Sequence, residues 1–298
     1  MKMGKTGRDW TQIYAIYGID DWQTPVFLLI HAILFSFLSI IILLYFPPIC
    51  LFFESIPSNL PSGTTRFAIG FIGSVTAISA VCLYLAACNI FYSSVYLQWE
   101  MAQRMVTTIE DWSSIHQALV IGCSRGILLN SVAMQLKKCG SSGRVVGIDS
   151  GKSTVVSALQ TARIEGVEEF VTCREGDGRR LPFGDGYFDI VTSAMFLHRV
   201  GKELGRSSVG AAAERMRVVG EVVRVLKPGG IGVVWDLVHV GEYVKKLKEM
   251  KMEEIRVSER VTAFMVSSHI VSFRRPRQQV TNMGEDVRLD WRFCNIDL

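Results

Sequence analysis

Residues 118–149 read ALVIGCSRGILLNSVAMQLKKCGSSGRVVGID, and this stretch decides the fold. Its first four residues are apolar, which favours a strand buried on both faces, as in a parallel sheet. Gly122 and Gly126 then permit a tight turn, and Ile127–Lys138 has the apolar spacing of a helix. Val145–Ile148 is the next apolar run. The stretch therefore predicts a strand, a glycine turn, a helix and a second strand.

An acidic residue, Asp149, stands at the carboxyl end of the second predicted strand. A strand–turn–helix unit of this kind directs the free N–H groups of the helix N-terminus at an anionic ligand group. A carboxylate at the end of the following strand can accept two hydrogen bonds from a ribose diol. We therefore expect this part of the chain to bind a small molecule that carries an adenosine group.

The composition narrows the class of protein. A length of 298 residues leaves room for a full α/β domain and a smaller part, and the hydrophobic content of 49% predicts a membrane segment. The formal net charge of +4 is small and the basic residues are dispersed, so we expect no nucleic-acid partner. The 7 cysteines form no CxxC motif and no Cys/His cluster, so we expect no metal site and no disulfide framework.

Two long uncharged segments precede the glycine turn. The first, at about 26–46, is apolar over the roughly 20 residues that cross a bilayer. The second, at about 67–91, is rich in Gly, Ala and Ser, which let membrane helices pack closely. We predict a transmembrane hairpin within residues 25–99. An interfacial aromatic belt is expected at Tyr92, Tyr96 and Trp99.

The basic residues that flank these segments predict the orientation of the chain. Three Lys or Arg residues precede the first segment, one lies between the two, and Arg104 follows the second. The positive-inside rule therefore places the N-terminal segment 1–24, both termini and the domain that follows on the cytosolic side. We expect an integral membrane protein with two spans; the sequence does not identify the membrane.

Strand and helix patterns alternate through residues 100–275, which is typical of a doubly wound parallel sheet. Further helices are expected at 100–116, 152–165, 211–226 and 242–252, and further strands at 170–173, 187–193, 231–235, 254–264 and 268–273. Residues 227–230, KPGG, are expected to end the third of these helices as a turn. The last two strands are expected to form an antiparallel pair. The polar tail 276–298 receives no assignment.

Four blocks of this region, in order, resemble the motifs of class I S-adenosylmethionine-dependent methyltransferases, in particular the methyltransferase type 11 group. They are ALVIGCSRG (118–126), VVGIDSGKS (145–153), REGDGRRLPFGDGYFDIVTSAMFLH (174–198) and EVVRVLKPGGIGVVWD (221–236). The resemblance implies an α/β, Rossmann-like, seven-stranded mixed sheet with helices on both faces. The hairpin before this domain resembles that of plant membrane-anchored methyltransferase-like proteins.

The resemblance also implies S-adenosylmethionine as cofactor. Asp149 matches the acid that binds the ribose hydroxyls, and Asp177 matches the residue that reads the adenine amino group. The implied reaction is methyl transfer to an unidentified acceptor. A hydrophobic small molecule or a lipid as acceptor would explain the membrane anchor; the alternative is that the anchor only sets the location of the protein. The implied cofactor-binding residues are Gly122, Cys123, Ser124, Gly126, Asp149, Ser150, Asp177 and Gly178.

His198 is the candidate catalytic residue. It follows the fourth predicted strand, at the edge where parallel α/β sheets bind ligands, and an imidazole can take a proton from a hydroxyl acceptor. The alternative is a pocket-lining or surface histidine. Trp235 and Asp236 end the fifth predicted strand at the same edge, where they would shape the acceptor site.

The chain departs from the family pattern at two positions. Val120 stands where the family usually has an acid, and Ser124 stands where it usually has a glycine. A serine costs about 1–2 kcal/mol if the turn requires a left-handed conformation there. These two departures support a first alternative, an inactive methyltransferase-like membrane interaction protein. The Rossmann-like sheet leaves a second alternative open, an NAD(P)-dependent oxidoreductase. Against the second, the chain has no Tyr-x-x-x-Lys pair.

Overall fold

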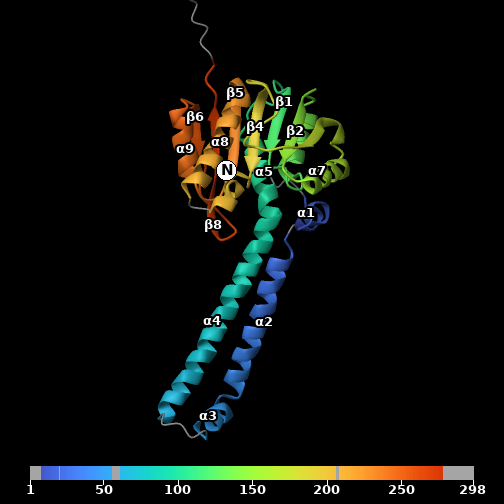
Figure 1. The fold of residues 1–298 in the computed structure, drawn as a ribbon. Coiled ribbons are helices and arrows are strands. Elements are labelled where there is room, and N and C mark those ends of the chain that lie inside the picture. Colours follow the sequence, from blue (N-terminus) through green and yellow to red (C-terminus); the bar gives the residue numbers. More distant parts are fainter. Residues whose placement is uncertain (1–7, 20, 56–60, 206–207, 278–298) are drawn as a thin grey trace, which may run out of the picture.

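The computed structural model describes residues 8–19, 21–55, 61–205 and 208–277. An α/β domain stands on one end of a long two-helix hairpin (Figure 1). The helices are α1 (Trp10–Tyr17), α2 (Gln23–Leu44), α3 (Phe46–Glu54), α4 (Ser62–Ser94), α5 (Tyr96–Thr107), α6 (Ile127–Lys138), α7 (Lys152–Ile164), α8 (Val209–Val225) and α9 (Val240–Glu249). The strands are β1 (Gln117–Ile121), β2 (Arg144–Asp149), β3 (Val171–Glu175), β4 (Phe188–Ala194), β5 (Leu226–Asp236), β6 (Glu253–Val257), β7 (Val261–Ala263) and β8 (Val266–Arg274).

The described strands form one mixed sheet in the order β3-β2-β1-β4-β5-β8-β6, with β7 paired to β8. The pairs among β1 to β5 are parallel, whereas β8 runs antiparallel between β5 and β6. The expected mixed α/β sheet with a closing antiparallel part is therefore confirmed. The carboxyl ends of the parallel strands all lie at one edge, and we call this edge the carboxyl edge.

Two apolar cores cover the two faces of the sheet. Along β1, Ala118 and Val120 pack with α5 and α6, whereas Leu119 and Ile121 pack on the side of α8 and α9. Because successive side chains of a strand point to opposite faces, a strand that is covered on both sides must be apolar throughout. This requirement explains the uninterrupted apolar run that the sequence shows at β1.

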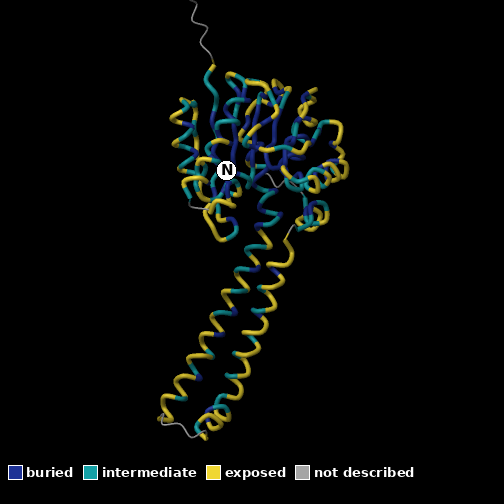
Figure 2. Tube along the Cα trace, viewed as in Figure 1, coloured by how far each residue is buried: buried dark blue, intermediate teal, exposed yellow. Residues whose placement is uncertain are grey.

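Helices α2 and α4 form the hairpin and expose their apolar side chains along most of their length (Figure 2). They contain 22 and 33 residues and are long and apolar enough to cross a membrane. The two helices approach closely at Gly73: a Cβ there would lie 2.9 Å from Ile42 Cγ2, and Ser39 Oγ donates to Gly73 O at 3.1 Å. Small residues thus permit the helix contact, as expected.

The N-terminal segment is attached to the α/β domain through α1. Tyr17 Oη donates to Glu165 Oε1 at 2.9 Å, and Arg8 forms a 2.6 Å ion pair with the same carboxylate. The rings of Tyr14 and Phe91 stack with centroids 4.7 Å apart, which joins α1 to the end of α4. The segment was expected only to precede the first span, and the structure also gives it a place on the domain.

The structure corrects three expectations. The helix expected at 100–116 is α5, and it begins at Tyr96; Trp99 is accordingly buried against the domain, 7% exposed, instead of lying in an aromatic belt. The strand expected at 254–264 is divided into β6 and β7. The KPGG sequence belongs to β5, because Gly229 N donates to Arg275 O and Arg275 N donates to Gly230 O. Most of the expected tail, from 278 on, lies outside the described residues.

Candidate active site

The turn after β1 requires left-handed backbone at three positions. Gly122, Ser124 and Gly126 have φ angles of 78°, 47° and 85°. Only glycine adopts this conformation at little cost, so Ser124 carries a strain of about 1–2 kcal/mol. The turn is closed by Gly122 N, which donates to Ile148 O at 2.8 Å, and Gly126 N, which donates to Cys123 O at 2.8 Å.

Asp149 connects this turn to the end of β2. The residue is 8% exposed. Its Oδ2 accepts from the backbone N–H of Ser124 at 3.0 Å, and its Oδ1 accepts from Thr154 Oγ1 at 2.9 Å and from Gly151 N at 3.3 Å. A carboxylate has about four acceptor sites. Asp149 therefore retains acceptor capacity beyond these contacts.

A cavity of about 570 Å³ lies at the carboxyl edge beside Asp149. Its lining includes Asp149, Ser150, Asp177 and Gly178, which are four of the residues expected to bind the cofactor. The volume falls within the usual range of about 300–1,000 Å³ for small-molecule sites. Residues from the ends of β2 and β3 therefore meet around one cavity, as the sequence motifs implied.

The carboxylate of Asp177 faces Arg179. Arg179 Nε lies 3.0 and 2.9 Å from the two carboxylate oxygens, and hydrogen bonding to this guanidinium lowers the pKa of Asp177. Arg179 in turn contacts Glu214 on α8 through a 3.2 Å ion pair. An ionised carboxylate can accept a hydrogen bond from an amino group, so Asp177 can recognise an adenine ring from this position.

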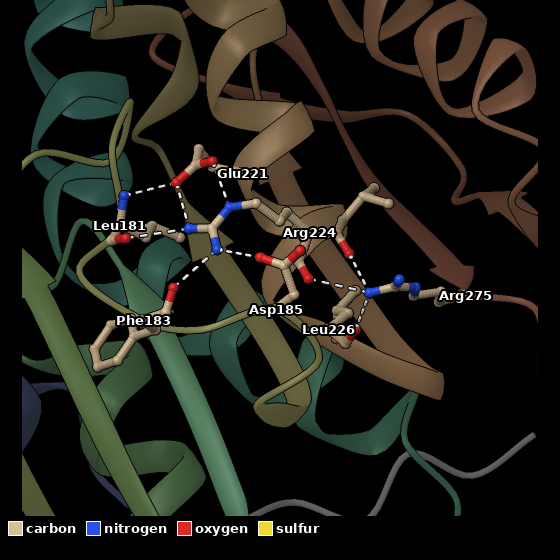
Figure 3. Close-up of polar contacts among 8 residues, drawn as sticks. Leu181, Phe183, Asp185, Glu221, Arg224, Leu226 and Arg275 are labelled. Atoms are coloured by element: carbon tan, nitrogen blue, oxygen red, sulfur yellow. Dashed lines mark hydrogen bonds and ion pairs between the residues drawn. The ribbon is translucent and has the colours of Figure 1, made fainter.

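The segment after Asp177 is held by a polar network from α8 (Figure 3). Arg224 donates to the carbonyl oxygens of Phe183 at 2.8 Å and Leu181 at 3.1 Å, and it pairs with Asp185 at 2.7 Å. Glu221 Oε2 accepts from Leu181 N at 2.7 Å and from Arg224 Nη2 at 2.8 Å. One arginine thus fixes the loop that directly follows the cavity residues Asp177 to Arg179.

The expected cofactor residues of the turn itself do not line the cavity. Cys123 is buried, with its Sγ 3.6 Å from both Val120 O and Ile148 O. Hydrogen bonding to Cys173 and burial raise the pKa of the Cys123 thiol, so this side chain is neutral and belongs to the core. The side chain of Cys123 is therefore not available to a ligand in the cavity.

Phe196, which the sequence analysis did not select, covers the turn. A Cβ on Gly122 would lie 2.6 Å from the Cβ of Phe196, and a Cβ on Gly178 would lie 2.9 Å from its Cε1. The ring therefore rests on both glycines and also lines the cavity. It fills the space directly over Gly122, and this is why Gly122 does not contribute to the cavity wall. The only feature of the sequence that pointed to Phe196 as a site residue was its position just after the fourth strand.

His198 and Asp236 are brought together from the ends of β4 and β5. His198 Nδ1 lies 2.5 Å from Asp236 Oδ1, and the backbone N–H of His198 donates to Asp236 Oδ2 at 2.8 Å. Asp236 is fully buried and also accepts from Leu237 N at 2.8 Å and from Tyr243 Oη at 3.4 Å. Since Asp236 occupies Nδ1, Nε2 is the nitrogen of His198 that remains for a ligand proton.

Among the described residues, no group of three or more His, Cys, Asp or Glu side chains is arranged to hold a metal ion. The parallel sheet, its antiparallel insertion and a cavity at the carboxyl edge define the class of the protein as a Rossmann-like α/β fold of the class I methyltransferase type. Residues 119–234 match the family described as Methyltransf_11, a methyltransferase domain. The domain belongs to this S-adenosylmethionine-dependent methyltransferase family.

Two relatives are demethylmenaquinone methyltransferases. That of Lactobacillus johnsonii is 30% identical over 118 residues, which are 39% of this chain and 42% of the relative. That of Thermus thermophilus is 34% identical over 105 residues, 35% of this chain and 41% of the relative. The chain thus spans about half the length of the curated relatives it matches, or less. Among solved structures, the YcgJ protein of Bacillus subtilis aligns with a TM-score of 0.48 and 16% identity, over 61% of this chain and 99% of that one.

The residues at the cavity fit the adenosine half of S-adenosylmethionine. Two carboxylates, Asp149 and Asp177, line one cavity, and both are hydrogen-bond acceptors for the hydroxyl and amino groups of such a ligand.

Proposed function

We propose that this chain is a membrane-anchored methyltransferase that transfers a methyl group from S-adenosylmethionine to a hydrophobic small molecule or a lipid. The observation that carries the proposal is the direction of the carboxyl edge. The edge that holds Asp149, Asp177 and His198 is directed toward the end of the helical hairpin (Figure 1). If α2 and α4 cross a membrane, this edge faces the membrane surface.

Contacts from the end of α4 support this direction. Ser93 Oγ accepts from the backbone N–H of Phe264, and Asn89 Oδ1 accepts from that of Met265, at 3.0 and 2.8 Å. Phe264 and Met265 form the turn that leads into β8, at the same edge as the carboxyl end of β5. On the other side, Arg125 of the glycine turn donates to Tyr17 O and Ile19 O beside α1.

The flanking charges support a cytosolic position of both termini and of the catalytic domain. The relatives named demethylmenaquinone methyltransferases support a hydrophobic acceptor, because their names state a lipid-soluble quinone substrate for those proteins. An anchor beside the carboxyl edge would place the site where such a molecule is concentrated.

In this proposal Asp149 and Asp177 hold the adenosine part of the cofactor, and the glycine turn lies under its methionine part. The cofactor supplies an electrophilic methyl group, so the protein has mainly to align the acceptor and exclude water. His198 takes the proton of a hydroxyl acceptor at Nε2. Asp236 fixes the tautomer and the orientation of the imidazole through Nδ1.

A second candidate function is that of an inactive methyltransferase-like membrane protein that binds a partner. Phe196 favours it, because a bulky ring packs directly against Gly122 of the turn that would lie under the methionine half of the cofactor. Val120 also leaves that half without the usual carboxylate. Binding of S-adenosylmethionine separates the two candidates.

The test of the proposed reaction uses the full chain in lipid nanodiscs with tritium-methyl S-adenosylmethionine and a total membrane lipid extract. We expect label in the organic phase, and at least a tenfold slower transfer by His198→Gln, as removal of a general base predicts. The matched control His116→Gln lies at the opposite edge of the sheet, before β1, and should transfer at the unaltered rate. Label transferred from the cofactor only to water-soluble products would contradict the hydrophobic acceptor. Label that stays entirely in unreacted S-adenosylmethionine would contradict the reaction.

A further inference from the structure

We propose that the β7–β8 turn, formed by Phe264 and Met265 and continued by Val266, is a bilayer contact that seats the carboxyl edge on the membrane surface. The occupant of this surface is the boundary between lipid headgroups and acyl chains. The inference rests on the proposed anchoring of the hairpin α2–α4 and adds a second, separate contact made by the catalytic domain itself.

The conformation of the turn does not favour the residues that occupy it. Ala263 pairs with Val266, so only two residues connect the strands, and both have left-handed φ angles, 48° for Phe264 and 62° for Met265. Such turns favour Asn-Gly, because residues with a Cβ are disfavoured in this conformation. A large aromatic and a large aliphatic side chain are therefore not explained by the turn itself.

The turn is apolar and uncharged, and Met265 is its exposed residue. Met265 is 62% exposed and the adjoining Val266 is 37% exposed, whereas Phe264 is half-buried and packs against the core of the domain. No charged residue occurs between Arg260 and His269. An exposed turn of a water-facing domain normally carries polar residues, whereas a short apolar segment can insert at a lipid interface.

The height of the turn along the hairpin matches the membrane boundary. Arg66 is the last charged residue before an uncharged run that continues to Trp99. A span of about 30 Å at 1.5 Å per residue needs about 20 residues, so a bilayer that starts after Arg66 ends at about residue 86. Leu85 is still 64% exposed there. Asn89, which holds the backbone of Met265, lies about 5 Å higher.

Aromatic residues mark the same level of α4. Phe91 and Tyr92 are 40% and 42% exposed, and aromatic side chains favour the headgroup region. Ser93, which accepts from Phe264 N, is fully buried. The turn is therefore held rigidly against α4 at the height where the hydrocarbon core gives way to headgroups.

The position of the turn limits which part of the acceptor can reach the His198–Asp236 pair. Along β8, Met265 is four residues from His269, which pairs with Asp236 of β5, and four residues of strand span about 13 Å. The His198–Asp236 pair therefore lies about 13 Å along the strand from the seated turn. The reacting atom of the acceptor must belong to its headgroup or ring end, which can leave the acyl region, and not to a hydrocarbon tail.

The experiment measures immersion depth with a nitroxide label in the full chain, reconstituted in phosphatidylcholine nanodiscs. Cysteines other than the buried Cys50, Cys123 and Cys173 are replaced, and a single label is introduced by Met265→Cys. Accessibility to oxygen is compared with accessibility to a water-soluble nickel chelate. We expect oxygen to be favoured at position 265. A label there that is accessible to nickel like a water-exposed site would overturn the proposal.

Two reference labels separate this proposal from the anchoring on which it rests. Ile78→Cys lies midway along α4, 64% exposed, and should report the hydrocarbon core. Tyr187→Cys precedes β4 at the opposite edge, 47% exposed, and should report water. If the label at position 78 is more accessible to oxygen and the label at position 265 is more accessible to nickel, only the proposed membrane contact of the turn is overturned. Nickel preference at 78 overturns the anchoring itself.

A turn-preserving variant provides the second measurement. Phe264→Asn combined with Met265→Gly keeps a two-residue turn and its backbone donors but removes the apolar side chains. A label introduced by Val266→Cys should favour oxygen in the parent chain and lose at least half of that preference in the double variant. An unchanged preference would show that the two side chains do not hold the strand end on the bilayer.

Discussion

At the residue scale, Gly122 meets two structural requirements at one position. Its φ of 78° is left-handed, and the ring of Phe196 occupies the space where a side chain would begin. The sequence analysis assigned the glycine to the approach of a cofactor. In the structure the same glycine also admits Phe196, which comes from the end of the fourth strand of the chain.

The substitution Gly122→Ala should therefore lower the free energy of unfolding by about 2–5 kcal/mol. About 1–2 kcal/mol comes from the left-handed backbone and about 1–3 kcal/mol from overpacking against Phe196. Thermal unfolding of the full chain in detergent measures the loss. In the background of Phe196→Gly, which also removes the Cβ that the new methyl group would meet, only the backbone part should remain. Equal losses in both backgrounds would contradict the contact.

A glycine with no neighbour provides the matched control. Gly220 lies within α8 and a Cβ there would meet nothing within 4 Å. Gly220→Ala should raise the free energy of unfolding by about 0.5–1 kcal/mol, because alanine is the better helix former.

At the element scale, the network around Arg224 fixes the loop from Leu181 to Asp185 against α8 (Figure 3). Hydrogen bonds from Arg224 hold the pKa of Glu221 below its usual value, although burial acts in the opposite direction. A carboxyl group whose pKa is lowered by folding stabilises the folded state above its unfolded pKa. This stabilisation is lost as the pH falls through the folded pKa.

Glu221→Gln should therefore destabilise the protein by about 1–3 kcal/mol at pH 7, the usual size for hydrogen bonds to a charged group. The difference from the parent chain should shrink as the pH falls below the usual glutamate pKa and through the lower pKa of folded Glu221, where this residue of the parent becomes protonated. Thermal midpoints at pH 7 and pH 3 measure it. Glu249→Gln is the control, since its contact with Lys246, at 3.8 Å, is an exposed pair of little expected effect. If the difference in thermal midpoint between Glu221→Gln and the parent chain did not depend on pH, the charge of Glu221 would not be the source of the stabilisation.

Elements with a strong local pattern could be predicted from the sequence. The helix expected at Ile127–Lys138 matches α6 at both ends, because a glycine precedes it and its apolar spacing is regular. KPGG was misassigned because Pro and Gly are typical of turns, whereas here pairing with Arg275 extends the strand. That pairing involves residues almost fifty positions apart, and no local signal reports it.

At the scale of the whole molecule, the sequence predicted a hairpin and an α/β domain but not how they meet. Trp99 was expected at a membrane interface and is buried in the domain, since α4 is followed by α5 after a single residue. The docking of α1 and the pairing of His198 with Asp236 likewise join segments far apart in the chain. Such contacts depend on the tertiary arrangement. The spacing of the motifs therefore predicted only some of the residues that meet at the candidate site.

The central claim is that the carboxyl edge binds S-adenosylmethionine, and calorimetric titration of the full chain in nanodiscs tests it most directly. We expect saturable binding of S-adenosylmethionine and of its demethylated product. Asp149→Asn and the exposed Asp177→Asn should each weaken binding about 10–100-fold, the equivalent of one hydrogen bond to a charged group. Asp111→Asn, at the opposite edge, should bind like the parent chain. No heat of binding by the folded parent chain, or equal affinity of all these variants, would contradict the account.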